Sequence, residues 1–150
     1  ESGQPELITH CESLGIGDHA HIVGPVPNKQ VSHFYGIIDV FVVSRPDTRV
    51  TRLVTPLKPF EAMYHARPLV MTNLPALAEI IDEGITGVLY PPGNLPKLVE
   101  SIGKILTDKE FAETLGNAAR DWTISERTWK NVCSEYTEAY DRATQNSRDK

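Results

Sequence analysis

The sequence predicts an α/β protein with a Rossmann-like parallel sheet and flanking helices. Short apolar runs of strand length alternate with amphipathic stretches of helical length, which is the pattern of βαβ units. The run from Ile37 to Val43 is almost wholly apolar, as expected of a central parallel strand covered on both faces. A chain of 150 residues is long enough to bury one domain core.

The composition argues against several classes of function. An apolar content of 40% and a charged content of 23% are ordinary for a soluble globular protein, and the net charge of -5 argues against a nucleic-acid partner. The longest apolar runs are too short to span a membrane. The two cysteines and five histidines show no metal-ligand spacing, and two cysteines make no disulfide framework. We therefore expect a cytoplasmic protein with no bound metal or cofactor.

Hydrophobic periodicity and helix-capping residues place the individual elements. Gly15 is a typical residue to end the first helix, and Trp122 and Trp129 are expected in the core of the C-terminal helices. The elements expected in the first part of the chain are a helix over 5–14, a strand over 21–24, a helix over 28–36, a strand over 37–43 and an irregular segment over 44–58. Those expected afterwards are a helix over 59–65, a strand over 69–72, a helix over 75–83, a strand over 87–90, and helices over 94–107, 109–121 and 126–144.

The segment after the strand over 37–43 is the most informative candidate site, because ligands of open α/β sheets bind outside the carboxyl ends of the strands. At about fifteen residues it is longer than most such connections, and such length is usually functional or disordered. It carries Arg45, Arg49 and Arg52. It ends with the run Thr55-Pro56-Leu57-Lys58-Pro59-Phe60-Glu61.

The end of this segment has the residues of a helix N-terminus. Proline is favoured at the first helical position, which places Pro59 there, Lys58 at the cap and Glu61 in the first turn. A lysine at the positive end of a helix is electrostatically unfavourable, and such departures from local preference occur at functional sites. Lysine together with free backbone N–H groups suits a phosphate or pyrophosphate. The alternative is that Lys58 simply points into solvent.

Glu61 has two interpretations that local physics does not separate. A glutamate in the first turn can accept a hydrogen bond from the cap N–H and interacts favourably with the helix dipole. It can equally accept hydrogen bonds from ribose hydroxyls, as acidic residues near nucleotide-binding helices do.

Several sequence blocks follow one another along nearly the whole chain. They are Leu14-Gly15-Ile16, His21-Ile22-Val23-Gly24-Pro25-Val26, His33-Phe34-Tyr35, Ile38 to Arg45, Thr55 to Met63, Arg67 to Thr72, Pro75 to Ile81, Glu83 to Gly93, and Thr128-Trp129. Each block is moderately specific, and their joint order and spacing is a strong signal. In this order the chain resembles the C-terminal, nucleotide-sugar-binding domain of the retaining group 1 glycosyltransferases, which have the GT-B fold and are similar to glycosyltransferase family 4.

The resemblance implies a donor site for a nucleotide diphosphate-sugar. The family's signature is two glutamates with seven residues between them, and Glu61 matches the second, which holds the nucleotide ribose. The first falls on Leu53, so the contact with the transferred sugar or its diphosphate lacks its usual carboxylate. The other matches are Lys58 near the phosphates, Thr55, Pro56 and Leu57 beside the diphosphate, and Val26, whose backbone faces the base.

The resemblance also implies parts that this chain does not contain. The family's glycine-rich first loop and the Arg/Lys pair that neutralises the leaving diphosphate lie upstream of every block found here, so the catalytic residues are expected there. Of the family's strand order 3-2-1-4-5-6, the chain resembles only strands 3 to 6. We therefore expect residues 1–150 to be a partial C-terminal domain that lacks its first two strands and is inactive alone. The acceptor would bind an N-terminal domain elsewhere in a larger polypeptide, which can associate peripherally with a membrane.

The implied reaction is transfer of a sugar from a nucleotide diphosphate-sugar to an acceptor, with retention at the anomeric carbon and without a protein-bound metal. The departing diphosphate would be stabilised electrostatically. Two alternatives stay open. One is a GT-B-like epimerase, which binds a nucleotide-sugar but has no acceptor. The other is a degenerate scaffolding domain, and the feature that supports it is Leu53 in place of the first glutamate. The sequence does not fix the base, the sugar or the acceptor.

The assignment of Lys58 to the phosphates predicts a selective effect of its removal. Lys58→Ala should weaken binding of a nucleoside diphosphate more than binding of the corresponding nucleoside, because only the diphosphate carries the charge that the lysine would neutralise. Parallel titrations of both ligands measure the ratio. Equal losses for the two ligands would count against the assignment.

Overall fold

The computed structural model describes residues 3–148, apart from some side chains of the last helix, and the chain divides after Phe34 into two compact units. The first unit contains α1 (Gln4–Ser13), the short 3-10 helix η1 (Gly17–His19) and most of α2 (Asn28–Gly36), whose last residues belong to the second unit. Gly15 has a positive φ of 70°, and the N–H groups of Gly15 and Ile16 donate to the carbonyls of Glu12 and Cys11. This hydrogen-bonding pattern ends α1 as the sequence predicts.

The segment expected to be a strand over 21–24 is irregular, and this prediction is wrong. Residues 20–27 have no regular secondary structure, and they pair with no strand in the described part of the chain. A strand depends on a neighbour for its backbone hydrogen bonds, which the local sequence cannot supply. Val26, predicted to face the base, lies in this segment and is half-buried within the first unit.

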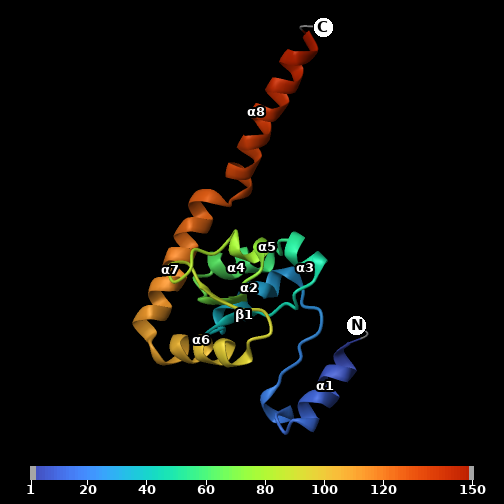
Figure 1. Ribbon diagram of the computed structural model, residues 1–150, viewed down its shortest axis with the longest axis vertical. Helices are drawn as coiled ribbons and strands as arrows, with labels where there is room; N and C mark the ends of the chain where they lie inside the picture. The colour runs from blue at the N-terminus through green and yellow to red at the C-terminus, as the bar shows by residue number, and fades with distance from the viewer. Residues whose placement is uncertain (1–2, 149–150) are drawn as a thin grey trace. The chain divides into compact units, whose positions relative to one another are not determined.

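The second unit is built on a parallel sheet in the order β1-β2-β3, formed by β1 (Phe41–Val43), β2 (Leu69–Thr72) and β3 (Val88–Tyr90). In the register, Val42 is opposite Val70, and Val70 is opposite Val88. Every residue of β2 is buried, because the strand lies between two others and has helices on both faces. Figure 1 shows α4 on one side of the sheet and α6 on the other. The α/β prediction with a parallel sheet and flanking helices is confirmed.

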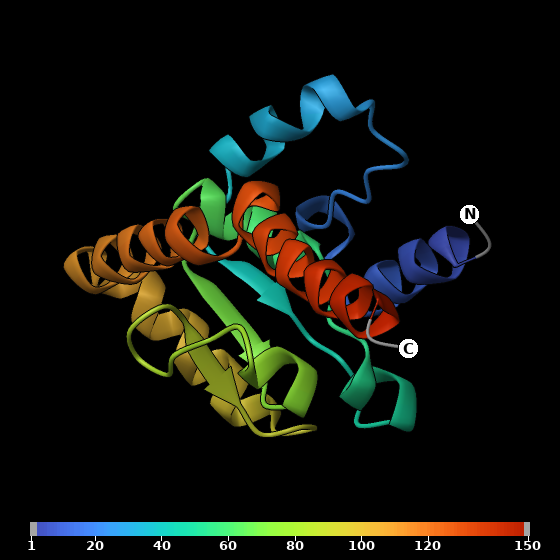
Figure 2. The same ribbon diagram turned by 90° about the horizontal axis from the view of Figure 1, so that it is seen from above.

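Helices connect the strands and cover the sheet. They are α3 (Arg49–Leu53), α4 (Lys58–Tyr64), α5 (Pro75–Ala78), α6 (Leu95–Thr107), α7 (Lys109–Glu126) and α8 (Trp129–Arg148). Asn94 and Asp108 cap α6 and α7 by accepting hydrogen bonds from the N–H groups of Lys97 and Phe111. Figure 2, seen from above, shows α7 and α8 meeting at a bend beside the sheet.

Several predicted bounds need correction. The strand expected over 37–43 forms only from Phe41, and Ile37 is 77% exposed. The segment over 44–58 is not wholly irregular, because the Thr48 and Thr51 side chains form a capping box that starts α3. Leu57 rather than Lys58 is the cap of α4, so Lys58 is the first helical residue and Pro59 the second. The helix expected over 75–83 ends at Ala78.

The core lies on both faces of β2. On the α6 side, Val70 packs in one buried cluster with Tyr90, Ile105 and Leu115. Elsewhere in the unit, Met63, Leu69, Met71, Leu74 and Leu77 are fully buried. Each such side chain contributes roughly 1.5–3 kcal/mol relative to leaving it exposed. This burial fixes the sheet, and with it the ends of the strands from which the site residues extend.

The C-terminal end of α4 packs closely against α7. Ala66 follows the helix with a positive φ of 53°, and the N–H groups of Ala66 and Arg67 donate to the carbonyls of Met63 and Ala62. This is the same capping pattern that ends α1, but with alanine in the left-handed position where glycine is usual. Gly116 of α7 lies directly against the Ala66 carbonyl, where a side chain would clash. The contact between α4 and α7 therefore depends on a glycine on one side and a strained alanine on the other.

Ala66→Gly should stabilise the protein. The left-handed conformation costs a non-glycine residue roughly 1–2 kcal/mol, and the greater chain entropy of glycine offsets part of the relief, which leaves a net gain of about 0.5–1 kcal/mol. Urea unfolding would show this as a higher midpoint at an unchanged slope. Ala118→Gly, within the regular helix α7, is the matched control and should lower the midpoint. A lower midpoint for Ala66→Gly as well would contradict the strain argument.

Candidate functional site

A cavity of about 440 Å³ lies at the start of α4, and all of its lining residues belong to the second unit. Its volume and mostly apolar wall are typical of small-molecule sites. The lining residues are Thr55, Leu57, Phe60, Glu61, Glu79, Ile80, Arg127, Trp129 and Val132. They come from the connection before α4, from α4 itself, from the end of α5 and from the bend between α7 and α8. Four segments that are distant in sequence therefore form one site.

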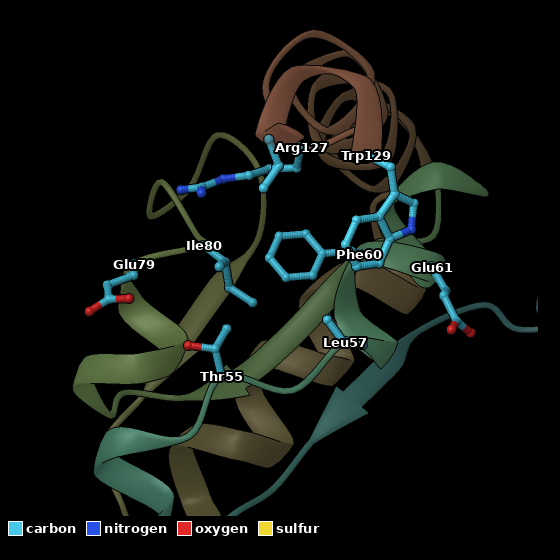
Figure 3. Close-up of a pocket in the computed structure, with 9 residues that line it drawn as sticks. Thr55, Leu57, Phe60, Glu61, Glu79, Ile80, Arg127 and Trp129 are labelled. Atoms are coloured by element: carbon cyan, nitrogen blue, oxygen red, sulfur yellow. The ribbon is translucent and has the colours of Figure 1, made fainter. Parts of the chain in front are cut away.

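Some of the predicted donor-binding residues meet in this cavity and others do not. Thr55, Leu57 and Glu61 line it. Pro56 and Lys58, which lie between them in the sequence, are not among its lining residues, and Lys58 is exposed. Figure 3 shows the Phe60 and Trp129 rings toward the middle of the cavity and the Glu61 carboxylate at its margin, turned away from Ile80. The structure thus groups three of the six predicted residues.

The Glu61 carboxylate has a partner that the sequence pattern did not suggest. The Tyr35 hydroxyl donates a hydrogen bond of 2.8 Å to Oε2 of Glu61. Tyr35 is 6% exposed, and its ring stacks on His65 with 5.1 Å between the centroids and an angle of 11° between the planes. Neither of the two interpretations of Glu61 included this bond. Both rest on the local sequence, and the bond joins residues that are 26 positions apart.

The hydrogen bond has an electrostatic consequence for Tyr35. Burial, followed by the hydrogen bond to Glu61 and the charge of that carboxylate, raises the pKa of Tyr35 well above its ordinary value. A tyrosine with the ordinary pKa of about 10 is already protonated at physiological pH, and the raised pKa keeps Tyr35 a hydrogen-bond donor to Glu61 at more alkaline pH as well.

The connection between β1 and α4 is held by its own polar contacts. The Arg52 guanidinium bonds both carboxylate oxygens of Asp47, at 2.5 and 2.7 Å, and its hydrogen bond lowers the pKa of Asp47. Arg45 donates from its side chain to the Val54 carbonyl at 2.9 Å. Leu53, at the first glutamate position of the signature, ends α3 and is 72% exposed. These contacts engage Arg45 and Arg52 within the connection itself.

Polar groups also join the carboxyl ends of the three strands. The Arg45 backbone N–H donates to the Thr72 hydroxyl at 2.9 Å, and Thr72 lies 3.1 Å from the Tyr90 hydroxyl. Tyr90 in turn donates to the Ser44 hydroxyl at 2.8 Å. Thr72 and Tyr90 are buried, so this network ties the start of the β1–α4 connection to the neighbouring strands.

Sequence reasoning missed the wall of the cavity that comes from the C-terminal helices. Trp129 was expected in the core, but it is 77% exposed and lines the cavity, so this prediction is wrong. Arg127 lies at the bend before α8, with its guanidinium 5.3 Å from the Trp122 ring, and Trp122 stacks on Phe60. The block Thr128-Trp129 was the available signal, since a tryptophan at the start of a helix can line a binding site as well as pack in a core.

The described part of the chain contains neither a cluster of metal-ligating side chains nor a membrane-spanning helix. Its His, Cys, Asp and Glu side chains form no group of three or more that could hold a metal ion. None of its helices combines the length and the apolar character needed to cross a membrane.

Comparison with known proteins assigns the family. The sequence profile described as Glycosyl transferases group 1 matches residues 1–122. The chain belongs to this family. The sulfoquinovosyl transferase SQD2 of Arabidopsis thaliana is 31% identical over 115 residues, which cover 75% of this chain and 22% of that protein. The spore coat protein SA of Bacillus subtilis is 28% identical over 142 residues, 90% of this chain and 36% of that protein. The chain thus spans between about a fifth and a little over a third of the length of these relatives.

Solved structures of glycosyltransferases share the fold. A glycosyltransferase from Rickettsia africae has a TM-score of 0.82 at 19% identity, covering 97% of this chain and 38% of that one. Alr3699/HepE of Anabaena in complex with UDP-glucose has a TM-score of 0.79 at 17% identity, covering 92% and 36%. The matched architecture is the C-terminal domain of the GT-B glycosyltransferases.

The raised pKa of Tyr35 can be measured directly. In an absorbance titration of the phenol groups, the difference between wild type and Tyr35→Phe should show no phenolate forming near the ordinary tyrosine pKa of about 10. Glu61→Gln should move the ionisation of Tyr35 downward, because it removes the negative charge. The pKa of Tyr35 is higher in the folded protein than in the unfolded chain, so its protonated hydroxyl contributes to the free energy of unfolding. This contribution is complete below about pH 10 and is lost as the pH rises through the folded-state pKa. Phenolate formation by Tyr35 near pH 10 would contradict the structure.

Proposed function

We propose that the protein transfers a sugar from a nucleotide diphosphate-sugar to an acceptor, with retention of the anomeric configuration, and that this chain supplies the donor-binding half. Membership of the group 1 glycosyltransferases supports the reaction class. The observation that carries the site is the cavity at the start of α4, where Thr55, Leu57 and Glu61 lie together. The Anabaena relative of the same fold is solved with UDP-glucose, which supports a nucleotide-sugar as the donor.

The donor would bind across the beginning of α4. The Glu61 carboxylate at the margin of the cavity accepts hydrogen bonds from the ribose hydroxyls, and the backbone over residues 55–57 lies along the diphosphate. Lys58, which is exposed in the first turn, would neutralise phosphate charge from outside the cavity wall. Val26 belongs to the first unit, and its contact with the base stays a prediction from the sequence.

The chemical step needs stabilisation of the departing diphosphate. In a transfer of this kind negative charge develops on the leaving group, and preorganised positive groups lower the barrier. Arg45 and Arg52 are engaged by Val54 and Asp47, and Leu53 offers no carboxylate. The family resemblance implies that the Arg/Lys pair for the leaving diphosphate lies upstream of this chain, so the groups that act on it would include residues outside this chain, together with the acceptor-binding domain.

Glu61→Gln should weaken nucleotide binding by about tenfold or more, because a hydrogen bond to a charged acceptor contributes roughly 1.5–3 kcal/mol. Titration of UDP, GDP and ADP against the protein at its full natural length measures the effect and identifies the base. Glu113→Gln is the matched control, since Glu113 lies with Ile38 and Pro68 at the opposite, amino end of the strands. The control should bind as wild type does.

The same preparation tests the reaction. Product formation that depends on an added acceptor, with the donor's anomeric configuration seen in the product by NMR, supports a retaining transferase. Turnover of the nucleotide-sugar without an acceptor would indicate an epimerase instead. Absence of nucleotide binding in the full-length protein would overturn the proposal and favour a scaffolding domain with Leu53 in place of the first glutamate.

A further inference from the structure

Tyr35 and Glu61 form a pair that the proposed function does not yet use. The tyrosine comes from the end of α2 and the glutamate from the start of α4, and the bond between them is 2.8 Å long. The Tyr35 ring is fixed by its stack on His65 and by a tilted contact with Phe41 at 5.9 Å between centroids. A buried ring held on two sides has little freedom, so its hydroxyl is a rigid donor.

We propose that Tyr35 is a positioning residue for the donor site, which holds one carboxylate oxygen of Glu61 so that the other accepts hydrogen bonds from a vicinal diol of the ligand. This inference rests on the proposed function of Glu61 toward the ribose. A glutamate side chain in the first turn of a helix is exposed and has several rotamers, and ordering it on binding costs about 0.5–1.5 kcal/mol. Tyr35 orders it before the ligand arrives.

The chemistry of the pair explains why a tyrosine suits this position. An ionised carboxylate only accepts hydrogen bonds, and both hydroxyls of a ribose can donate to it. Tyr35 donates to Oε2 and leaves Oε1 to the ligand. A tyrosine is neutral at physiological pH, so it adds no second negative charge that would repel the diphosphate, as a carboxylate in its place would.

A merely structural bond between Tyr35 and Glu61 would give a different pattern of effects. In that case the loss of the hydroxyl would weaken every ligand of the domain to a similar degree, through a general loosening of α4. A positioning role acts through Glu61 alone, so it affects only ligands that carry the diol. Comparison of a nucleotide with its 2′,3′-dideoxy form separates the two roles.

The test is a titration of UDP, GDP and ADP, and of the 2′,3′-dideoxy form of each, against the full-length protein and its Tyr35→Phe variant. For the nucleotide that wild type binds, Tyr35→Phe should weaken the ribose form about threefold to tenfold and leave the dideoxy form unchanged. Unchanged binding of the dideoxy form also shows that the variant is folded. Tyr64→Phe is the matched control, because Tyr64 lies on α4 beside His65 but is 57% exposed, and it should bind both forms as wild type does.

The outcomes separate this inference from the proposed function. Equal losses for the ribose and dideoxy forms, or no loss for either, would overturn the positioning role of Tyr35 while Glu61→Gln still weakened the ribose form. Failure of the wild-type protein to bind any of the three nucleotides would overturn the proposed function, and this inference with it.

Discussion

The site depends on the complete burial of β2. A parallel strand with helices on both faces has no side that can tolerate water, and Leu69 to Thr72 are all buried. The partners β1 and β3 are fixed by their register against it. The Thr72 hydroxyl, at the end of this strand, then connects Arg45 and Tyr90 across the three strand ends. The connection that leads to α4 therefore starts from a rigid point, although much of its surface is exposed.

The prediction from sequence was most accurate where local pattern and tertiary environment agree. The strand over 69–72 and the helix from Asn28 to Gly36 have the predicted bounds. A continuous apolar run marks the strand in the sequence itself, and an asparagine marks the start of the helix. The segment over 21–24 also carries adjacent apolar residues, Ile22 and Val23, but forms no strand. Strand formation requires a paired neighbour, and the described residues include none for this segment.

The candidate site shows the same division between local and distant information. Thr55, Leu57 and Glu61 could be found because they lie within one short run that ends at a helix start. Arg127 and Trp129 could not, because only the bend between α7 and α8 brings them to the cavity, and periodicity alone assigns an apolar tryptophan to the core. Tyr35 was part of a recognised block, yet its bond to Glu61 spans two helices and has no signature in either.

The cavity separates the apolar and charged parts of the predicted site. Its middle is formed by Phe60 and Trp129, whereas Lys58 lies outside it and Glu61 stands at its margin. A nucleotide diphosphate-sugar combines uncharged rings with a diphosphate of high charge density, and burying that charge in an apolar cavity would be costly. The arrangement therefore favours a ligand that extends across the rim at the start of α4, with its charge near solvent and Lys58. In this proposed binding mode the orientation of the Glu61 carboxylate would decide the contact with the ribose, and the Tyr35 hydroxyl, which donates to Oε2 of Glu61, would set that orientation.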